Sequence, residues 1–96
     1  AAAYHQALLT AFGEVSDALA AQRQSALRGA ALRHAATAAR DAYALARARF
    51  ERGAIDFQAL LEVQRSLIQA EDAEADGRLG EFLAALALYR ALGGGA

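Results

Sequence analysis

The feature that most constrains the fold is the stretch from Tyr4 to Arg52, which contains no proline. Its only glycines are Gly13 and Gly29, and each costs about 1 kcal/mol relative to alanine, which a long helix tolerates. One helical face holds Leu8, Phe12, Val15 and Leu19. An unbroken helix here would extend about 70 Å at 1.5 Å per residue, longer than a compact domain of this size. The sequence therefore predicts an elongated helical protein.

Two apolar stripes run side by side along the second part of this helix. One stripe holds Ala35, Ala38, Ala42 and Leu45, and the other holds Ala39, Tyr43, Ala46 and Phe50. A helix with one packing partner needs only one such stripe, so two stripes predict two neighbours. Hydrophobic residues make up 56% of the chain, but many are alanines, which bury little area each. We therefore expect closely packed helices with a thin core.

The helical pattern stops at Gly53, which can adopt the left-handed conformation that ends helices. Arg49 and Arg52 precede it, where cations suit the negative end of the helix dipole. Asp56 follows as a predicted N-cap for a second helix that starts at Phe57. So short a connection predicts an antiparallel helical hairpin with a helix over about 4–52, a tip at 53–56 and a helix over about 57–92.

The second helix carries its own apolar series at alternating spacings of three and four. Its members are Phe57, Leu61, Gln64, Ile68, Ala75, Leu79, Phe82, Leu86 and Tyr89. Acidic residues and two glycines interrupt the series, which predicts a kink or break near Asp76–Gly80. Glycines after Leu92 predict the end of the helix. The fold class is thus all-α, a long, coiled-coil-like antiparallel hairpin, and we expect residues 1–96 to form a single helical-hairpin fragment of a larger domain.

The side chains that carry chemistry are sparse and isolated. His5 and His34 lack a partner at the spacing of a metal pair, the chain contains no cysteine, and no serine has a neighbouring base with an orienting acid. The basic residues are all arginines, and they alternate with Glu51, Glu62, Glu71, Asp72 and Glu74. A net charge of −1 distributed in this way does not predict a nucleic-acid surface. We expect no catalytic residue, no metal, no cofactor and no nucleic-acid partner.

Three blocks together resemble the C-terminal part of TolC-type outer-membrane factors. They are YHQALLTAFGEVSDALAA (4–21), AYALARARFERGAIDFQALLEVQRSLIQAE (42–71) and LYRALGGG (88–95). The resemblance implies a segment of a trimeric duct at the cell outer membrane that serves efflux or secretion. It also implies that the hairpin lies in the periplasm, as part of a hollow α-barrel in which each helix packs against two neighbours.

The resemblance assigns expected roles to two sets of residues. Gly53, flanked by Arg52 and Ala54, falls on the tip that docks the periplasmic adaptor, or membrane fusion, protein. Glu62 and Arg65 fall on positions that line the periplasmic aperture and help to hold it closed. An inner-membrane transporter would be an indirect partner through the adaptor. A ring of three carboxylates in a narrow mouth favours cations and can pair with arginines of a neighbouring protomer.

An alternative reading is a stand-alone soluble coiled-coil interaction module whose hairpin forms a four-helix bundle. From its residues alone, the Glu62 and Arg65 pair also fits an ordinary exposed ion pair at i and i+3. The chain has no starting methionine, so we expect a fragment of a longer protein. Because such a fragment exposes apolar stripes, we also expect it to self-associate.

Overall fold

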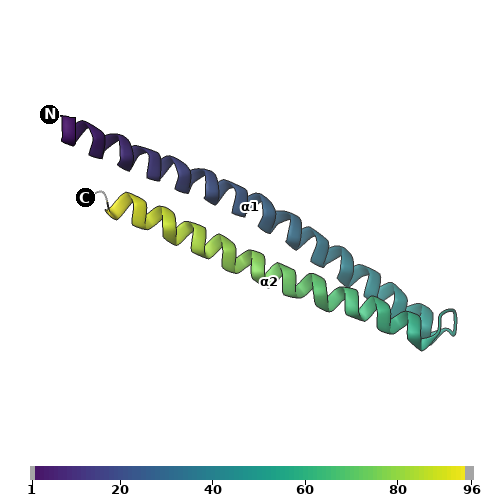
Figure 1. Cartoon of the computed structure of the whole chain (residues 1–96). Coiled ribbons are helices and arrows are strands. Elements are labelled where there is room, and N and C mark those ends of the chain that lie inside the picture. Colours follow the sequence, from purple (N-terminus) through teal and green to yellow (C-terminus); the bar gives the residue numbers. More distant parts are fainter. Residues whose placement is uncertain (1, 95–96) are drawn as a thin grey trace.

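The computed structural model describes residues 2–94 and consists of two long helices joined by a short turn. Helix α1 spans Ala2–Glu51 and helix α2 spans Phe57–Gly94. They run antiparallel, with both chain ends at one end of the molecule and the turn at the other (Figure 1). The hairpin measures 78 × 15 × 14 Å, and its radius of gyration of 21.6 Å far exceeds the roughly 13 Å of a compact domain of this length. The predicted all-α hairpin is confirmed.

One row of residues on each helix faces the other helix, and we call these two rows the seam. On α1 the seam comprises Ala11, Val15, Ala18, Gln22, Ser25, Gly29, Leu32, Ala36, Ala39, Tyr43 and Ala46. On α2 it comprises Leu60, Val63, Leu67, Ala70, Glu74, Gly77, Glu81, Ala84, Leu88 and Ala91. All of these residues are buried or half-buried, and their spacing alternates between three and four. This heptad repeat makes the helices wind around each other as a left-handed coiled coil.

The seam shows which of the two predicted stripes on α1 faces α2. Tyr43 and its stripe face α2, whereas the stripe with Leu45 is exposed along its whole length. On the first part of α1, the seam contains Ala11, Val15 and Ala18, so only Val15 of the apolar face noted from the sequence faces α2. Small seam residues let the helix axes approach closely and leave the larger side chains outside.

The apolar series noted on α2 lies outside the seam. Leu61 and Leu86 are half-buried, but Phe57, Ile68 and Phe82 are exposed, with 51 to 64% of their surface accessible. These side chains form a second face that α1 does not cover. The two faces expected for each helix are therefore present, and one of them is left open within this chain.

The break predicted near Asp76–Gly80 is wrong, because α2 is helical without interruption from Phe57 to Gly94. Gly77 lies in the seam, where a Cβ atom would come within 2.7 Å of Leu32 Cδ1. Glycine at this position allows close packing against α1 and does not end the helix. The helix end predicted after Leu92 falls near Gly94, and Gly95 and Ala96 lie outside the described residues.

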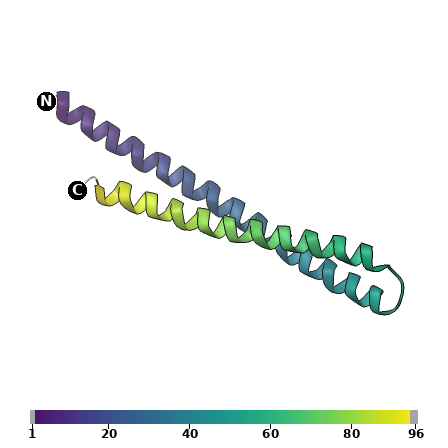
Figure 2. The same cartoon turned by 60° about the horizontal axis from the view of Figure 1, so that its bottom comes forward.

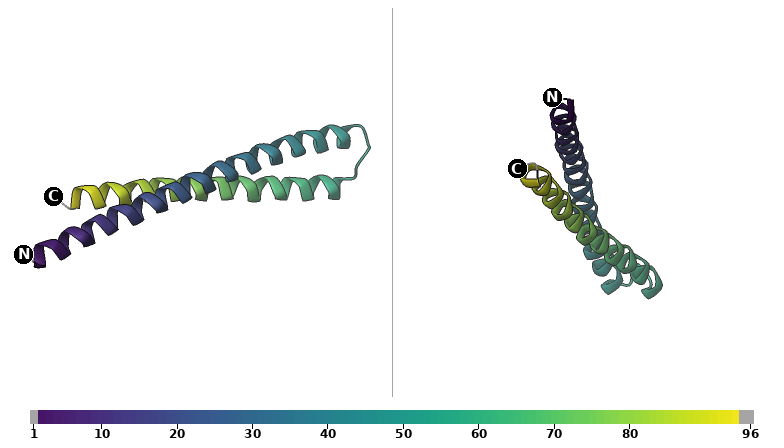
Figure 3. Two further views of the ribbon diagram at one scale, coloured as in Figure 1. Left: turned by 90° about the horizontal axis from the view of Figure 1, so that it is seen from above. Right: turned by 60° about the vertical axis from the view of Figure 1, so that its left-hand side comes forward.

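The two helices cross near the middle of the hairpin, as Figure 2 and both views in Figure 3 show. Because α1 has 50 residues and α2 has 38, the beginning of α1 extends past the end of α2 (Figure 1). We call the end with the chain termini the base and the end with the turn the tip. Three apolar residues are buried: Ala36 and Ala46 in the second half of α1, and Leu60 in the first turn of α2. The buried apolar residues therefore lie in the half of the hairpin next to the tip.

Candidate functional site

The turn at the tip, Arg52–Asp56, is built on one glycine in the left-handed conformation. Gly53 has a φ of 77°, and no other described residue has a positive φ. Its N–H donates to the carbonyl of Phe50 at 2.9 Å, and the N–H of Ala54 donates to the carbonyl of Arg49 at 2.8 Å. This pair of bonds is a Schellman motif, which satisfies carbonyls at the end of α1 that would otherwise lack partners. The predicted helix stop at Gly53 is confirmed.

Asp56 starts the second helix. Its Oδ1 accepts a hydrogen bond of 2.9 Å from the N–H of Ala59, and its own carbonyl accepts one from the N–H of Leu60 at 3.3 Å. The first bond is an N-cap, because it satisfies one of the free N–H groups in the first turn of a helix. The predicted cap is confirmed, and the change of direction is complete within five residues, 52–56.

Two partly exposed aromatic rings, one from each helix, pack against each other beside the turn. The ring centroids of Phe50 and Phe57 lie 5.8 Å apart with the planes tilted by 49°, a favourable geometry for aromatic pairs. Outside this pair, Arg52, Gly53 and Ala54 are all exposed. A Cβ atom at Gly53 would meet nothing within 4 Å, so backbone conformation alone requires glycine there. The turn thus presents a compact, rigid and accessible surface.

Glu62 and Arg65 lie above the turn on α2, and neither belongs to the seam. Both side chains are exposed, and within residues 2–94 neither forms an ion pair, with the other or with any other residue. The Glu62 carbonyl accepts a bond of 3.2 Å from the hydroxyl of Ser66. The local i, i+3 pair expected from spacing alone is therefore not formed. Both charged groups face away from α1.

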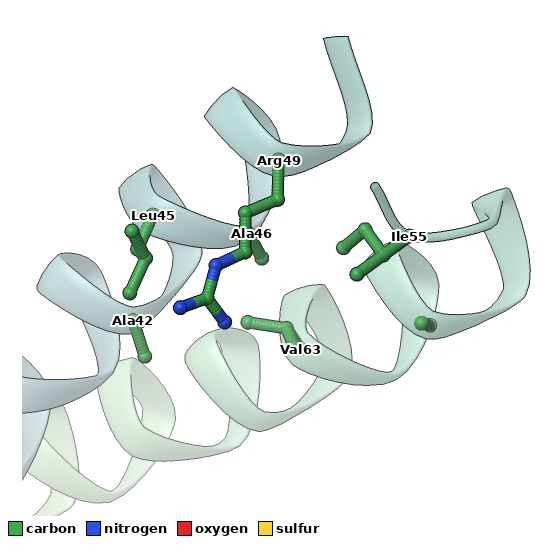
Figure 4. Close-up of a pocket in the computed structure, with 7 residues that line it drawn as sticks. Ala42, Leu45, Ala46, Arg49, Ile55 and Val63 are labelled. Atoms are coloured by element: carbon green, nitrogen blue, oxygen red, sulfur yellow. The ribbon is translucent and has the colours of Figure 1, made fainter. Parts of the chain in front are cut away.

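A pocket of about 310 Å³ lies between the helices next to the turn. Its apolar lining comes from Ala42, Leu45, Ala46, Ile55, Ala59 and Val63. Arg49 also lines it, and Figure 4 shows its guanidinium group lying between Leu45 and Val63. The sequence analysis missed this pocket, because alanines at helical spacing do not show where two helices leave space between them.

A cluster of ion pairs joins the helices around the middle of the hairpin, and the sequence analysis missed it too. Arg33 Nη1 lies 3.1 Å from Glu81 Oε1, and Arg40 bonds Glu71 at 3.3 Å and Glu74 at 3.0 Å. The hydrogen bond that Arg40 donates to the carboxylate of Glu74 is the main cause that raises the pKa of Arg40 above its ordinary value. The signal for these pairs was present in the sequence as arginines and glutamates at seven-residue spacing.

The described residues offer no centre for metal chemistry and no membrane-crossing helix. Within 2–94, no three His, Cys, Asp or Glu side chains are grouped so that they could hold a metal ion. No helix in that range combines the length and the apolar character that a membrane crossing needs. The features available for binding other proteins are the exposed turn, the adjoining pocket and the uncovered helix faces.

The family model for outer membrane efflux proteins matches residues 1–94, which is nearly the whole chain. The chain belongs to the outer membrane efflux protein family. This is a family of transport proteins and not of enzymes. The resemblance noted from the sequence is therefore confirmed.

Curated relatives align with the hairpin from end to end. Outer membrane protein OprJ of Pseudomonas aeruginosa is 43% identical over 94 residues, which are 98% of this chain and 20% of OprJ. The probable efflux pump outer membrane protein TtgC of Pseudomonas putida is 38% identical over 94 residues, covering 98% of this chain and 19% of TtgC. The pyoverdine export outer membrane protein OpmQ of Pseudomonas putida is 38% identical over 93 residues, covering 97% of this chain and 20% of OpmQ.

The chain spans about a fifth of the length of the curated relatives it matches. No solved structure matches it.

Proposed function

We propose that this hairpin is a wall segment of the periplasmic tunnel of an outer-membrane efflux duct, and that its tip docks a periplasmic adaptor protein. The observation that carries the proposal is the tight, exposed turn at Gly53 in a chain that matches the outer membrane efflux family over residues 1–94. Membership of that family favours the duct over a stand-alone coiled-coil module. The duct lies at the outer membrane, and its adaptor links it indirectly to an inner-membrane transporter.

The uncovered helix faces support assembly of the hairpin into a larger wall. Large apolar side chains on both helices are exposed, including Phe12 at 75% and Phe82 at 64%. Contiguous apolar surface of this kind marks sites where other protein surfaces pack. In a trimeric duct, neighbouring helices from the same protomer and from the adjacent one would cover these faces.

The geometry of the tip supports the docking proposal. The Schellman motif and the N-cap fix the backbone from Arg49 to Ala59, so the turn loses little conformational entropy when a partner binds. The absence of a side chain at Gly53 lets a partner approach the backbone closely. Arg52 and Ala54 flank this point of approach, and the apolar pocket next to Ile55 lies beside it.

In the full-length duct that contains this hairpin, Gly53→Trp tests docking, because a bulky ring at the point of approach blocks the partner. We expect loss of drug resistance in an efflux-deficient host, with the trimer still present on native gels. Gly53→Asn is the matched control, because asparagine tolerates the left-handed conformation and adds a small side chain, so most resistance is kept. Unchanged resistance with Gly53→Trp would remove the tip from the docking surface.

We also propose that Glu62 and Arg65 form part of the aperture gate. Both are exposed and make no ion pair within residues 2–94, so their charges are available to a neighbouring protomer. Ion pairs across protomer boundaries would give the aperture a closed state that a partner can release.

Conductance of the reconstituted trimer tests the gate. Glu62→Ala combined with Arg65→Ala should raise the conductance, because the bonds that hold the aperture closed are removed. Gln69→Ala, at another exposed position of α2, serves as the control and should leave the conductance as it is. If the double variant conducts like the parent, neither residue belongs to the gate.

A further inference from the structure

Two ion pairs repeat along the seam at the same spacing. The first joins Arg33 to Glu81 at 3.1 Å, and the second joins Arg40 to Glu74 at 3.0 Å. The two arginines are one heptad apart on α1, and the two glutamates are one heptad apart on α2. In an antiparallel pair these spacings give two equivalent rungs, which we call the ion-pair ladder.

A pair of buried glycines, Gly29 and Gly77, lies beside the ladder. An ideal Cβ at Gly77 would lie 2.7 Å from Leu32 Cδ1 and 3.7 Å from the Cα atom of Gly29. A Cβ at Gly29 would overlap the carboxylate of Glu81. The Leu32 side chain thus fills the space that the missing side chain of Gly77 leaves, and we call this fit the Leu32–Gly77 socket. The carboxylate of Glu81 lies over Gly29 in a similar way.

Charge alone does not choose the register of this hairpin. If α2 moved by one heptad relative to α1, the seam would stay in phase, and most of its alanines would meet residues of similar size. Arg40 would then lie beside Glu81, and Arg47, one heptad further along α1, would lie beside Glu74. The number of rungs would be unchanged. In the present register Arg47 instead pairs with Glu51 on its own helix at 3.4 Å.

Two features distinguish the registers, the socket and the length of the turn. In the shifted register Leu32 would face Ala84, whose Cβ would occupy the space that is empty at Gly77. The shift would also add seven residues to the turn, which would dissolve the hydrogen bonds around Gly53 and Asp56. A side chain in the middle of the hairpin is therefore coupled to the conformation of the tip.

We propose that the Leu32–Gly77 socket fixes the register of the hairpin among the alternatives that the ion-pair ladder allows, and thereby keeps Gly53 and Asp56 in a five-residue turn. These residues would position the tip without touching the partner. The register itself stands apart from any partner, and only its consequence for docking rests on the proposed function.

Moving the socket by one heptad tests the proposal. Gly77→Ala combined with Ala84→Gly fills the present socket and creates another opposite Leu32 in the shifted register. The chain contains no cysteine, so Asp41→Cys and Arg90→Cys, both exposed positions, can carry a unique pair of spin labels. Diluting the spin-labelled chain into an excess of unlabelled chain removes the contribution of distances between labels on different copies. We expect a second distance that is shorter by about 10 Å, which is seven residues at 1.5 Å each.

Two further variants keep the test decisive. Ala84→Gly alone retains the present socket and should give the parent distance. Leu32→Ala empties the socket without adding volume and should broaden the distance distribution even if the double variant folds poorly. A single, unchanged distance in both the double variant and Leu32→Ala, with helicity retained, would overturn the proposal, because the turn alone would then fix the register.

Amide exchange at the tip gives an independent readout without any partner. The N–H groups of Ala54 and Ala59 are hydrogen-bonded in the present turn and should be protected. In the population with the shorter distance these amides should exchange at least tenfold faster. Protection that stays at the parent level while the distance shortens would refute the link between socket and tip. Neither readout depends on adaptor binding, so failure of the docking proposal would leave this test intact.

Discussion

Gly53 and Asp56 each contribute to the tip through a single, identifiable interaction. Gly53 supplies a positive φ that lets two N–H groups turn back to the carbonyls of Arg49 and Phe50. Asp56 supplies a carboxylate that accepts from the N–H of Ala59. Neither position needs a side chain to fill space, because the turn is exposed. The stability of the turn therefore depends on backbone conformation and capping, and both can be tested one residue at a time.

Alanine should have opposite effects at two glycines of this chain. Gly53→Ala forces an L-residue into the left-handed region and should lower the free energy of unfolding by about 1 kcal/mol. Gly13→Ala lies inside α1, where a Cβ atom meets nothing within 4 Å, and should raise it by about 1 kcal/mol. Urea unfolding followed by circular dichroism at fixed chain concentration measures both. Equal effects at the two sites would show that the positive φ at Gly53 carries no strain for alanine.

Asp56→Ala should lower the free energy of unfolding by about 1 kcal/mol, because the N–H of Ala59 loses its capping acceptor. Asp56→Asn keeps an oxygen acceptor at the same position and should behave like the parent. The same unfolding measurement separates the two variants. A similar loss with asparagine would mean that the negative charge near the helix N-terminus, and not the hydrogen bond, provides the stabilisation.

At the scale of the helices, stability depends on which alanines lie in the seam. Ala36 is completely buried, whereas its neighbour Ala35 is exposed and belongs to the open stripe of α1. Both are alanines in the same stretch of helix, so their intrinsic helix propensities are equal. Any difference between substitutions at these two positions reports interhelical packing alone.

Ala36→Leu should cost about 1–3 kcal/mol, because the seam has no room for the larger side chain. Ala35→Leu should change the stability of the isolated hairpin by less than about 0.5 kcal/mol, as for most surface substitutions. Thermal unfolding at one chain concentration compares them directly. A larger loss at Ala35 would mean that the helices pack through the other stripe.

Local signals in the sequence were enough to predict the hairpin and both of its caps. Gly53 and Asp56 act on backbone groups within a few residues, so their roles can be read without knowing the partner helix. The choice of seam could not be read in this way. Two stripes with the same helical spacing run along α1, and the spacing alone does not show which of them faces α2. The Gly77 region was also misread, because a glycine that ends a helix and one that allows close packing look alike in sequence.

The features of the candidate site also differ in whether local sequence signals are enough to predict them. The conformation of the turn could be predicted, but the pocket near Arg49 and the ion-pair ladder depend on the register between helices, which local spacing does not give. The docking role of the tip and the gating role of Glu62 and Arg65 stay predictions. Those roles involve surfaces of other chains, and their tests need the assembled duct.

At the scale of the whole molecule, the tip of the hairpin is stabilised by contacts within the chain to a greater extent than the base is. The tip side has buried seam residues, the aromatic pair and both caps. Beyond Gly29 and Gly77 toward the base, the seam residues are only half-buried, and this part carries many of the large exposed side chains. These base side chains are Tyr4, Leu8, Leu9, Phe12, Leu19, Leu79, Phe82, Leu83, Tyr89 and Leu92. Because the chain spans about a fifth of its relatives' length, we expect other surfaces of the duct to cover the base.

The isolated hairpin should therefore self-associate through its base. Burial of exposed apolar area drives such association, and the aromatic rings of Phe12 and Phe82 supply much of it. Sedimentation equilibrium over a hundredfold range of concentration should show a mass that rises above 10.0 kDa. Phe12→Ser combined with Phe82→Ser should shift the transition to higher concentration. Leu45→Ser removes an exposed apolar side chain nearer the tip and is expected to have a smaller effect. A monomer at every concentration, or an equal shift with Leu45→Ser, would show that the hairpin does not self-associate through its base.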